Sequence, residues 1–200
     1  NAFTLLIGTG IVLTIIGLIF YKPILYLFGA SDDTFPYAGS YIQIYLLGTV
    51  FVMVSVGMNP FINSQGFGNT GMISVLIGAV LNIILDPIFI FVLNLGVRGA
   101  AIATIISQFC STVWVLVFLT GKRAVLHLKW SCMWLQWKRV LRIIGLGVSS
   151  FIMAFTNSLV QVVCNATLQV YGGDIYVGVM TVLNSVRDIC TLPVMGITNG

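Results

Sequence analysis

Two polar residues, Asn82 and Asp86, interrupt an apolar stretch near the middle of the chain, and Pro87 follows directly after them. No other charged residue lies within ten positions of Asp86 on either side. A carboxylate in apolar surroundings is costly, because a low dielectric disfavours its charged form. In a membrane segment such a group is by default a candidate functional residue, able to exchange a proton or bind a small cation.

The spacing of nearby polar residues predicts a shared site. Asn82 and Asp86 are four positions apart, so they lie on one face of a helix. A turn centred near residue 96 puts Thr104 at a depth similar to that of Asp86, because a helix rises about 1.5 Å per residue. A turn near residue 68 leaves Asn59 within roughly two helical turns of Asn82 in depth. We therefore expect one internal site, formed by Asp86, Asn82, Thr104 and Asn59.

This predicted site could bind H⁺ or Na⁺. Amide and hydroxyl groups can hydrogen-bond either form of a carboxyl group, and their oxygens can join Asp86 and Asn82 in coordinating Na⁺. Pro87 lacks a backbone donor and clashes with the carbonyl of Ile83, so we expect a kink beside the carboxyl group. Protonation could then be coupled to bending of the helix. The alternative is an Asp86 that stays protonated and only links neighbouring helices.

Composition places these residues in a membrane protein. Hydrophobic residues make up 58% of the chain and charged residues only 7%, whereas a soluble domain has about 25% charged residues. A membrane span needs about 20 apolar residues, and on this basis we predict an all-α integral membrane protein with about six transmembrane helices. The predicted spans are residues 3–20, 41–62, 72–93, 100–120, 143–170 and 175–200.

Basic residues gather in the connection between the fourth and fifth predicted spans, residues 122–142. This connection contains no acidic residue, so the positive-inside rule places it in the cytoplasm. Aromatic and apolar residues recur there at helical spacing, which favours a short helix at the membrane interface: Trp130, Trp134, Trp137 and Leu141.

A second set of polar residues lies in the last two predicted spans. Amide side chains repeat every four positions, at Asn157, Gln161, Asn165 and Gln169. This pattern is typical of a helix beside a water-filled cavity, and hydrogen bonding between helices is an equal alternative. Arg187 and Asp188 follow in the next span, either paired with each other or facing a cavity. Asn157, Gln161 and Arg187 are therefore candidate cavity-lining residues.

Other kinds of chemistry have little support in the sequence. The four cysteines are widely spaced without a CxxC pair, and His127 is the only histidine, so we expect no metal site or redox centre. An intramembrane aspartyl protease requires two facing carboxylates. Only Asp86 and Asp188 lie within predicted spans, and neither belongs to a GxGD motif. We expect neither an enzyme nor a nucleic-acid-binding protein, and no cofactor apart from a coupling H⁺ or Na⁺.

Three segments resemble consecutive helices of the multidrug and toxic compound extrusion (MATE) transporters: NPFINSQGFGNTGM, GAVLNIILDPIFIF and LGVRGAAIATIISQ. The order N-x-x-x-D-P and then G-x-x-G-A-A-x-A-T, one short turn apart, carries the resemblance. The sequence looks most like the bacterial DinF-type subgroup, which is proton-coupled where characterised. The resemblance implies the third to eighth helices of a twelve-helix, two-lobe fold, so we expect an internal fragment. In it, residues 122–142 would link the amino-terminal lobe, residues 1–121, to the start of the carboxy-terminal lobe, residues 143–200.

The resemblance also implies a function and a location. We expect a secondary active multidrug efflux transporter, a drug/H⁺ or drug/Na⁺ antiporter with alternating access, in the bacterial plasma (inner) membrane. Asn82 and Asp86 match the cation site of the amino-terminal lobe, with Thr104 and Asn59 as partners from neighbouring helices. The expected partners are small lipophilic or cationic compounds, the lipid bilayer and the remainder of the same polypeptide, which would hold a further acidic residue.

Two other functions stay open at this stage. One is a flippase for lipid-linked saccharides from the same superfamily, which would need a strongly cationic cavity. Arg187 is the only basic residue within a predicted span, which disfavours this function. The other is a structural membrane subunit, which would not need the cluster of Asn82, Asp86 and Pro87.

Overall fold

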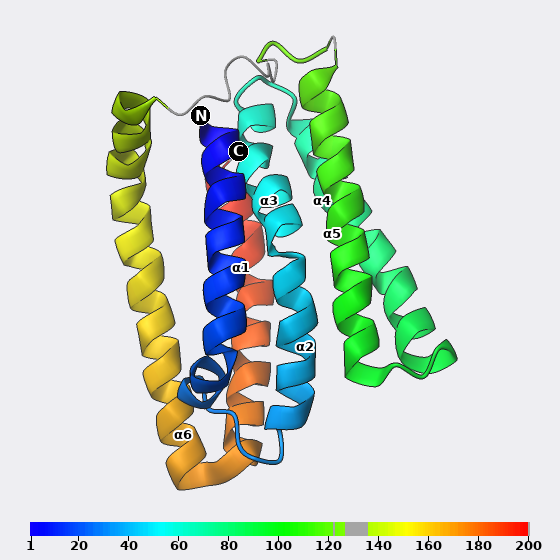
Figure 1. Ribbon diagram of the computed structural model, residues 1–200, viewed down its shortest axis with the longest axis vertical. Helices are drawn as coiled ribbons and strands as arrows, with labels where there is room; N and C mark the ends of the chain where they lie inside the picture. The colour runs from blue at the N-terminus through cyan, green and yellow to red at the C-terminus, as the bar shows by residue number, and fades with distance from the viewer. Residues whose placement is uncertain (122, 127–135, 200) are drawn as a thin grey trace. The chain divides into compact units, whose positions relative to one another are not determined.

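A computed structural model describes residues 1–121, 123–126 and 136–199 of the protein (Figure 1). The regular elements in these ranges are all helices, which confirms the predicted all-α fold. They are α1 (Ala2–Leu27), α2 (Phe35–Leu47), α3 (Thr49–Asn63), α4 (Gly68–Pro87), the π-helix η1 (Ile88–Val92), α5 (Gly96–Thr120) and α6 (Trp137–Asn199).

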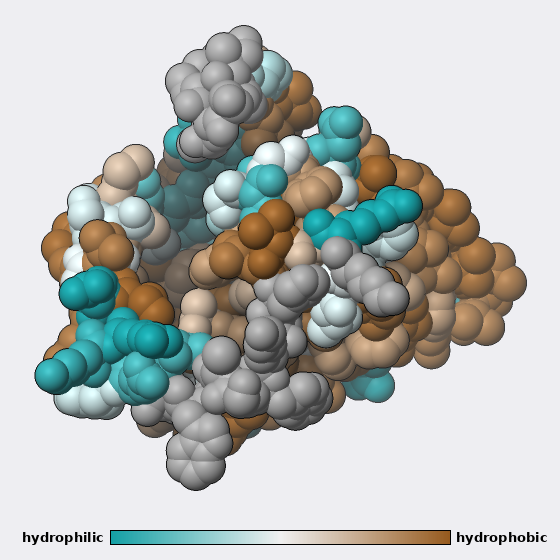
Figure 2. Space-filling view, turned by 90° about the horizontal axis from the view of Figure 1, so that it is seen from above, coloured by the Kyte–Doolittle hydropathy of each residue, from teal (hydrophilic) through white to brown (hydrophobic). Residues whose placement is uncertain are grey.

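The helices confirm the membrane architecture. By length and composition, α1, α4 with η1, α5 and α6 can each cross a membrane, and the pair α2 and α3 can cross as one bent span. Within α6 two helices meet at Gly173, which has a φ of 68°. Each of the six predicted spans therefore coincides with a helical segment. Large apolar side chains are exposed on the molecule, for example Ile83 and Phe91. Figure 2, which is seen from above, shows apolar residues over much of the right-hand side, as expected for a surface that contacts lipid.

The second predicted span, residues 41–62, is not one continuous helix. The chain bends by 59° between α2 and α3, and Gly48 lies at the break. A Cβ atom on Gly48 would lie 2.6 Å from Cγ1 of Ile105, so the glycine lets α5 pack closely here. The break leaves carbonyl groups at the end of α2 without donors from their own helix. One of them, on Leu46, accepts a hydrogen bond of 3.0 Å from the Thr14 hydroxyl.

The predicted linker, residues 122–142, is described only in part. Helix α6 begins at Trp137, so the last residues of this segment are helical and include Leu141. Trp130 and Trp134 lie outside the described residues, and the interfacial helix therefore stays a prediction.

The chain forms two compact units: the first comprises residues 1–21 and 39–148, and the second comprises residues 22–38 and 149–200. The connection between α1 and α2 thus packs with the carboxy-terminal part of the chain, within the second unit. There the Ser31 hydroxyl donates to one carboxylate oxygen of Asp174 at 2.8 Å, and the Gln169 amide donates to the other at 2.9 Å. The two lobes expected from the sequence, residues 1–121 and 143–200, stay a prediction.

Small residues fill the contact between α4 and α5 in the first unit, where the two helices run side by side (Figure 1). Helix α4 buries Gly71, Ser74 and Gly78. Residues of this size let two helix backbones approach closely. The Ser111 hydroxyl of α5 donates to the Ser74 carbonyl at 2.7 Å, so the polar groups in the contact are satisfied. The two helices thereby form a fixed frame for the residues one to two turns further along.

Candidate functional site

Three of the four predicted site residues form one hydrogen-bonded cluster between α4 and α5. The Asn82 Nδ2 donates to Oδ1 of Asp86 at 3.1 Å, and it lies 3.4 Å from Oγ1 of Thr104. The Thr104 hydroxyl donates to the Ala100 carbonyl at 2.9 Å, which leaves its oxygen free to accept from Asn82. Asn82 therefore lies between the carboxyl group on its own helix and the hydroxyl group on the next.

A cavity of about 320 Å³ adjoins this cluster, and residues of α3, α4 and α5 line it. Asn82 and Thr104 both belong to its lining, whereas Asp86 does not. Asp86 is half-buried and contacts the cavity through the Asn82 amide. A change in the protonation or cation binding of Asp86 would therefore reach the cavity through Asn82.

Asn59, the fourth predicted residue, lines the same cavity but does not bond to the cluster. Its Nδ2 donates to the Gly71 carbonyl at 3.0 Å and to the Ser74 hydroxyl at 2.7 Å. These contacts join α3 to α4. The structure thus gives Asn59 a packing role next to the site, separate from the contacts of Asp86.

Sequence reasoning missed several polar residues of the cavity wall, among them Ser55 and Gln108. The Ser55 hydroxyl donates to Oε1 of Gln108 at 2.9 Å, and both residues line the cavity. One signal could have found Gln108, since it lies four positions after Thr104 and therefore on the same face of α5. The same signal could have found Ser55, which lies four positions before Asn59 and therefore on the same face of α3.

Pro87 ends α4, and the backbone continues directly as the π-helix η1. In this wider turn the N–H of Leu93 donates to the carbonyl of Ile88 at 2.9 Å. Such π-turns are frequent at functional sites. The change in hydrogen-bond pattern begins at Ile88, two residues after Asp86, and the kink at Pro87 stays a prediction.

A second cavity, of about 380 Å³, lies within the second unit. The three residues predicted to line a cavity, Asn157, Gln161 and Arg187, all line this one. Asp188 also belongs to the lining, and its Oδ1 lies 3.6 Å from Nη2 of Arg187. The two alternatives considered for Arg187, pairing and facing a cavity, therefore both hold. Among the described residues, no group of three or more His, Cys, Asp or Glu side chains could hold a metal ion.

Known proteins resemble this chain in sequence. The family model described as MatE matches residues 1–88. The multidrug export protein MepA of Staphylococcus haemolyticus is 31% identical over 168 residues, which cover 82% of this chain and 36% of that protein. MepA of Staphylococcus aureus (strain MRSA252) is 27% identical over 166 residues, which cover 83% of this chain and 37% of that protein.

Solved structures resemble the chain in fold. An inward-facing multidrug resistance MATE family transporter of the MOP superfamily superposes with a TM-score of 0.88 at 25% identity, over 97% of this chain and 44% of that one. The chain belongs to the MATE family. An outward-facing MATE family structure has a TM-score of 0.83 at the same identity, over 97% of this chain and 43% of that one.

Membership of the MATE family, together with the helices long enough to span a membrane, makes the chain a multi-pass protein of the plasma membrane. The chain spans 36% of the length of the MepA proteins from two Staphylococcus species that it matches. This chain itself contains the Asn82–Asp86 pair and the polar cavity beside it.

Proposed function

We propose that these residues belong to a secondary active multidrug efflux transporter, which exchanges small lipophilic or cationic compounds for H⁺ or Na⁺. The observation that carries this proposal is the contact of Asp86 with Asn82, a residue of the cavity wall. The relatives named as multidrug export proteins support the substrate class. We propose no enzymatic activity and no cofactor besides the coupling ion.

Asp86 would exchange the coupling ion. When its carboxyl group is charged, the Asn82 amide can donate to it, as in the structure. When a proton neutralises the group, its charge no longer holds this amide, and Asn82 can turn toward Thr104 or toward a compound in the cavity. Na⁺ would instead be bound by oxygens of the three side chains together. Either way, the ion and the exported compound would compete through one amide.

Matched MATE structures in inward-facing and outward-facing conformations support alternating access as the transport cycle. The π-helix that begins two residues after Asp86 is consistent with a functional site, because such turns are frequent at functional sites. The remainder of the transporter would complete the route for the compound.

The proposal is tested with the full-length protein in lipid vesicles that contain rhodamine B ethyl ester, a lipophilic cation. An imposed proton gradient, or in a second arm a sodium gradient, should drive the dye against its own gradient, because exchange couples the two movements. A protonophore should abolish the first effect and a sodium ionophore the second. Dye movement that is unchanged with both gradients collapsed would contradict an antiporter.

Replacing Thr104 with valine tests the geometry of the cluster. Valine keeps the shape of threonine and removes the hydroxyl that lies near Asn82 and donates to the Ala100 carbonyl. A hydrogen bond contributes about 0.5–1.5 kcal/mol, so we expect the ion concentration for half-maximal export to rise by roughly twofold to tenfold. Thr104→Ser, which keeps the hydroxyl, is the control, and an equal effect of both substitutions would argue against a role for this group.

A further inference from the structure

We propose that the cavity of the second unit binds zwitterionic compounds, with Arg187 at their carboxylate and Asp188 at their cationic group. The inference rests on the proposed function only in taking the bound compound to be an export substrate. It concerns the cavity lined by Arg187 and Asp188, not the cavity beside Asp86, and it assigns a ligand class to the former.

The two cavities differ in charge. The cavity of the first unit has neutral polar lining residues with the Asp86 carboxyl group behind them, and no basic residue lines it in the described part of the chain. The lining of the second cavity includes one guanidinium and one carboxylate, Arg187 and Asp188. A simple cation would be attracted by one of these groups and repelled by the other. A compound that carries both charges can satisfy both groups.

The pair is held loosely enough to accept a ligand. Its nitrogen and oxygen atoms are 3.6 Å apart, whereas charge-assisted hydrogen bonds are about 2.7–2.9 Å long. A guanidinium has five N–H donors in a planar fork, so most of its donors are available for a bidentate contact with a carboxylate.

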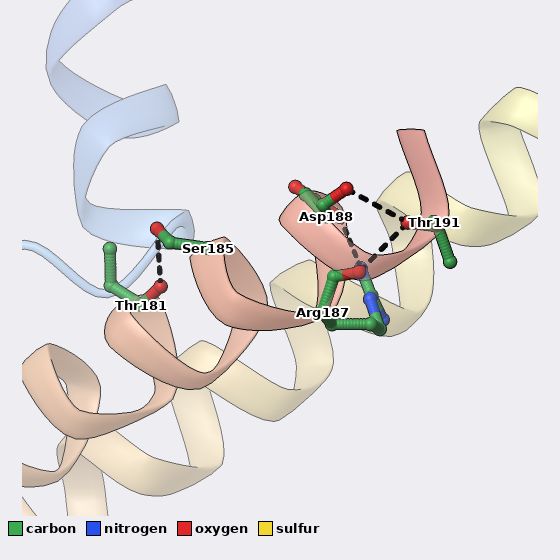
Figure 3. Close-up of polar contacts among 5 residues, drawn as sticks. All are labelled: Thr181, Ser185, Arg187, Asp188 and Thr191. Carbon is green, nitrogen blue, oxygen red and sulfur yellow. Dashed lines mark hydrogen bonds and ion pairs between the residues drawn. The ribbon is translucent and has the colours of Figure 1, made fainter. Parts of the chain in front are cut away.

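The pair lies within the helical part of α6. The Thr191 hydroxyl donates to the carbonyl of Arg187 at 2.9 Å and to the carbonyl of Asp188 at 3.2 Å. Figure 3 shows these contacts, with Arg187, Asp188 and Thr191 on one turn of α6. The side chains can therefore turn toward a ligand while their helix stays in place.

Amide groups complete the cavity wall. Asn157, Gln161, Asn165 and Asn184 line the cavity, and among the described residues their side chains have no hydrogen-bond partner. Each amide offers both donors and an acceptor, so the wall can bind polar groups of either kind between the two charges of a ligand. The volume of about 380 Å³ falls within the range of small-molecule sites, about 300–1,000 Å³.

A matched pair of dyes tests the inference. Rhodamine B carries a cationic ring system and a carboxylate, and its ethyl ester carries the cation alone. Fluorescence anisotropy would measure the binding of each dye to the purified full-length protein and to its Arg187→Gln variant. Because a hydrogen bond to a charged group contributes roughly 1.5–3 kcal/mol, the variant should bind rhodamine B at least about tenfold more weakly. Its affinity for the ester should stay the same or rise, because the substitution also removes the charge that repels a cation.

Two further variants serve as controls. Arg187→Lys keeps the positive charge and should retain more rhodamine B binding than Arg187→Gln, provided that both elute as monodisperse protein. Gly8→Ala on α1 lies in the lining of neither cavity, and a Cβ atom there has no neighbour within 4 Å, so this variant should leave rhodamine B binding at its original level. Equal losses for both dyes, unchanged rhodamine B binding in Arg187→Gln, or no binding to the original protein would overturn the inference.

The outcome is separable from that of the proposed function. If the ester is exported under an ion gradient but Arg187→Gln binds rhodamine B normally, only the zwitterion site is wrong. If gradients fail to drive the ester while rhodamine B binding still depends on Arg187, the antiporter is wrong and the site stands as a binding site.

Discussion

Replacing Asp86 with asparagine is expected to reduce ion-driven dye export to the background of empty vesicles. The amide has the shape of the carboxyl group but cannot release a proton, and it lacks the charge that would hold Na⁺. Asparagine can still accept a hydrogen bond from Asn82, so the contact between these positions and the helix packing around it should persist. The substitution therefore removes the ion exchange and retains the local structure.

The measurement is export of rhodamine B ethyl ester under the imposed proton or sodium gradient, with equilibrium binding of the ester as the companion. Binding should survive in Asp86→Asn, because the cavity wall itself is intact. Asp86→Glu, which restores a titratable group, should recover part of the export. Asp188→Asn is the matched control in the other cavity and should stay coupled to the gradient. Gradient-driven export by Asp86→Asn would show that another group couples the ion.

Helical periodicity was sufficient to predict the cluster of Asn82, Asp86 and Thr104. Four positions place two side chains on one face of a helix, and a short turn makes α4 and α5 antiparallel neighbours. The depth of each residue then follows from its distance to the turn. The same reasoning grouped Asn157 and Gln161 on one face of α6, where both line the second cavity.

Features that depend on competing partners could not be read from the sequence. Asn59 has the expected depth, but Ser74 and the Gly71 carbonyl take its amide donors first. The break at Gly48 lies in an apolar run that looks like one continuous helix, and it depends on the approach of Ile105 from α5. The packing of residues 22–38 with the second unit likewise rests on contacts such as that of Ser31 with Asp174, which are far apart in sequence.

Replacing Gly99 with alanine is expected to damage the first unit more than any other change of one methyl group. Gly99 lies in the first turn of α5, where the helix packs against η1. A Cβ atom there would lie 2.6 Å from the carbonyl oxygen of Phe89 and 2.7 Å from its carbonyl carbon. These are backbone atoms, which cannot rotate away as a side chain can. Either η1 or the start of α5 must therefore move.

This displacement should reach the candidate site, because Gly99 and Phe89 are each within about two helical turns of a cluster residue, Thr104 and Asp86 respectively. Overpacking of this kind typically costs about 1–3 kcal/mol, and thermal unfolding of the purified protein in detergent would show it as a lower midpoint. The ester should also bind more weakly. Gly8→Ala on α1 is the matched control, because a Cβ atom there has no neighbour within 4 Å, and alanine favours a helix by up to about 1 kcal/mol over glycine. Equal midpoints for Gly99→Ala and the original protein would mean that η1 yields without cost, and the π-helix could then not be a fixed part of the site.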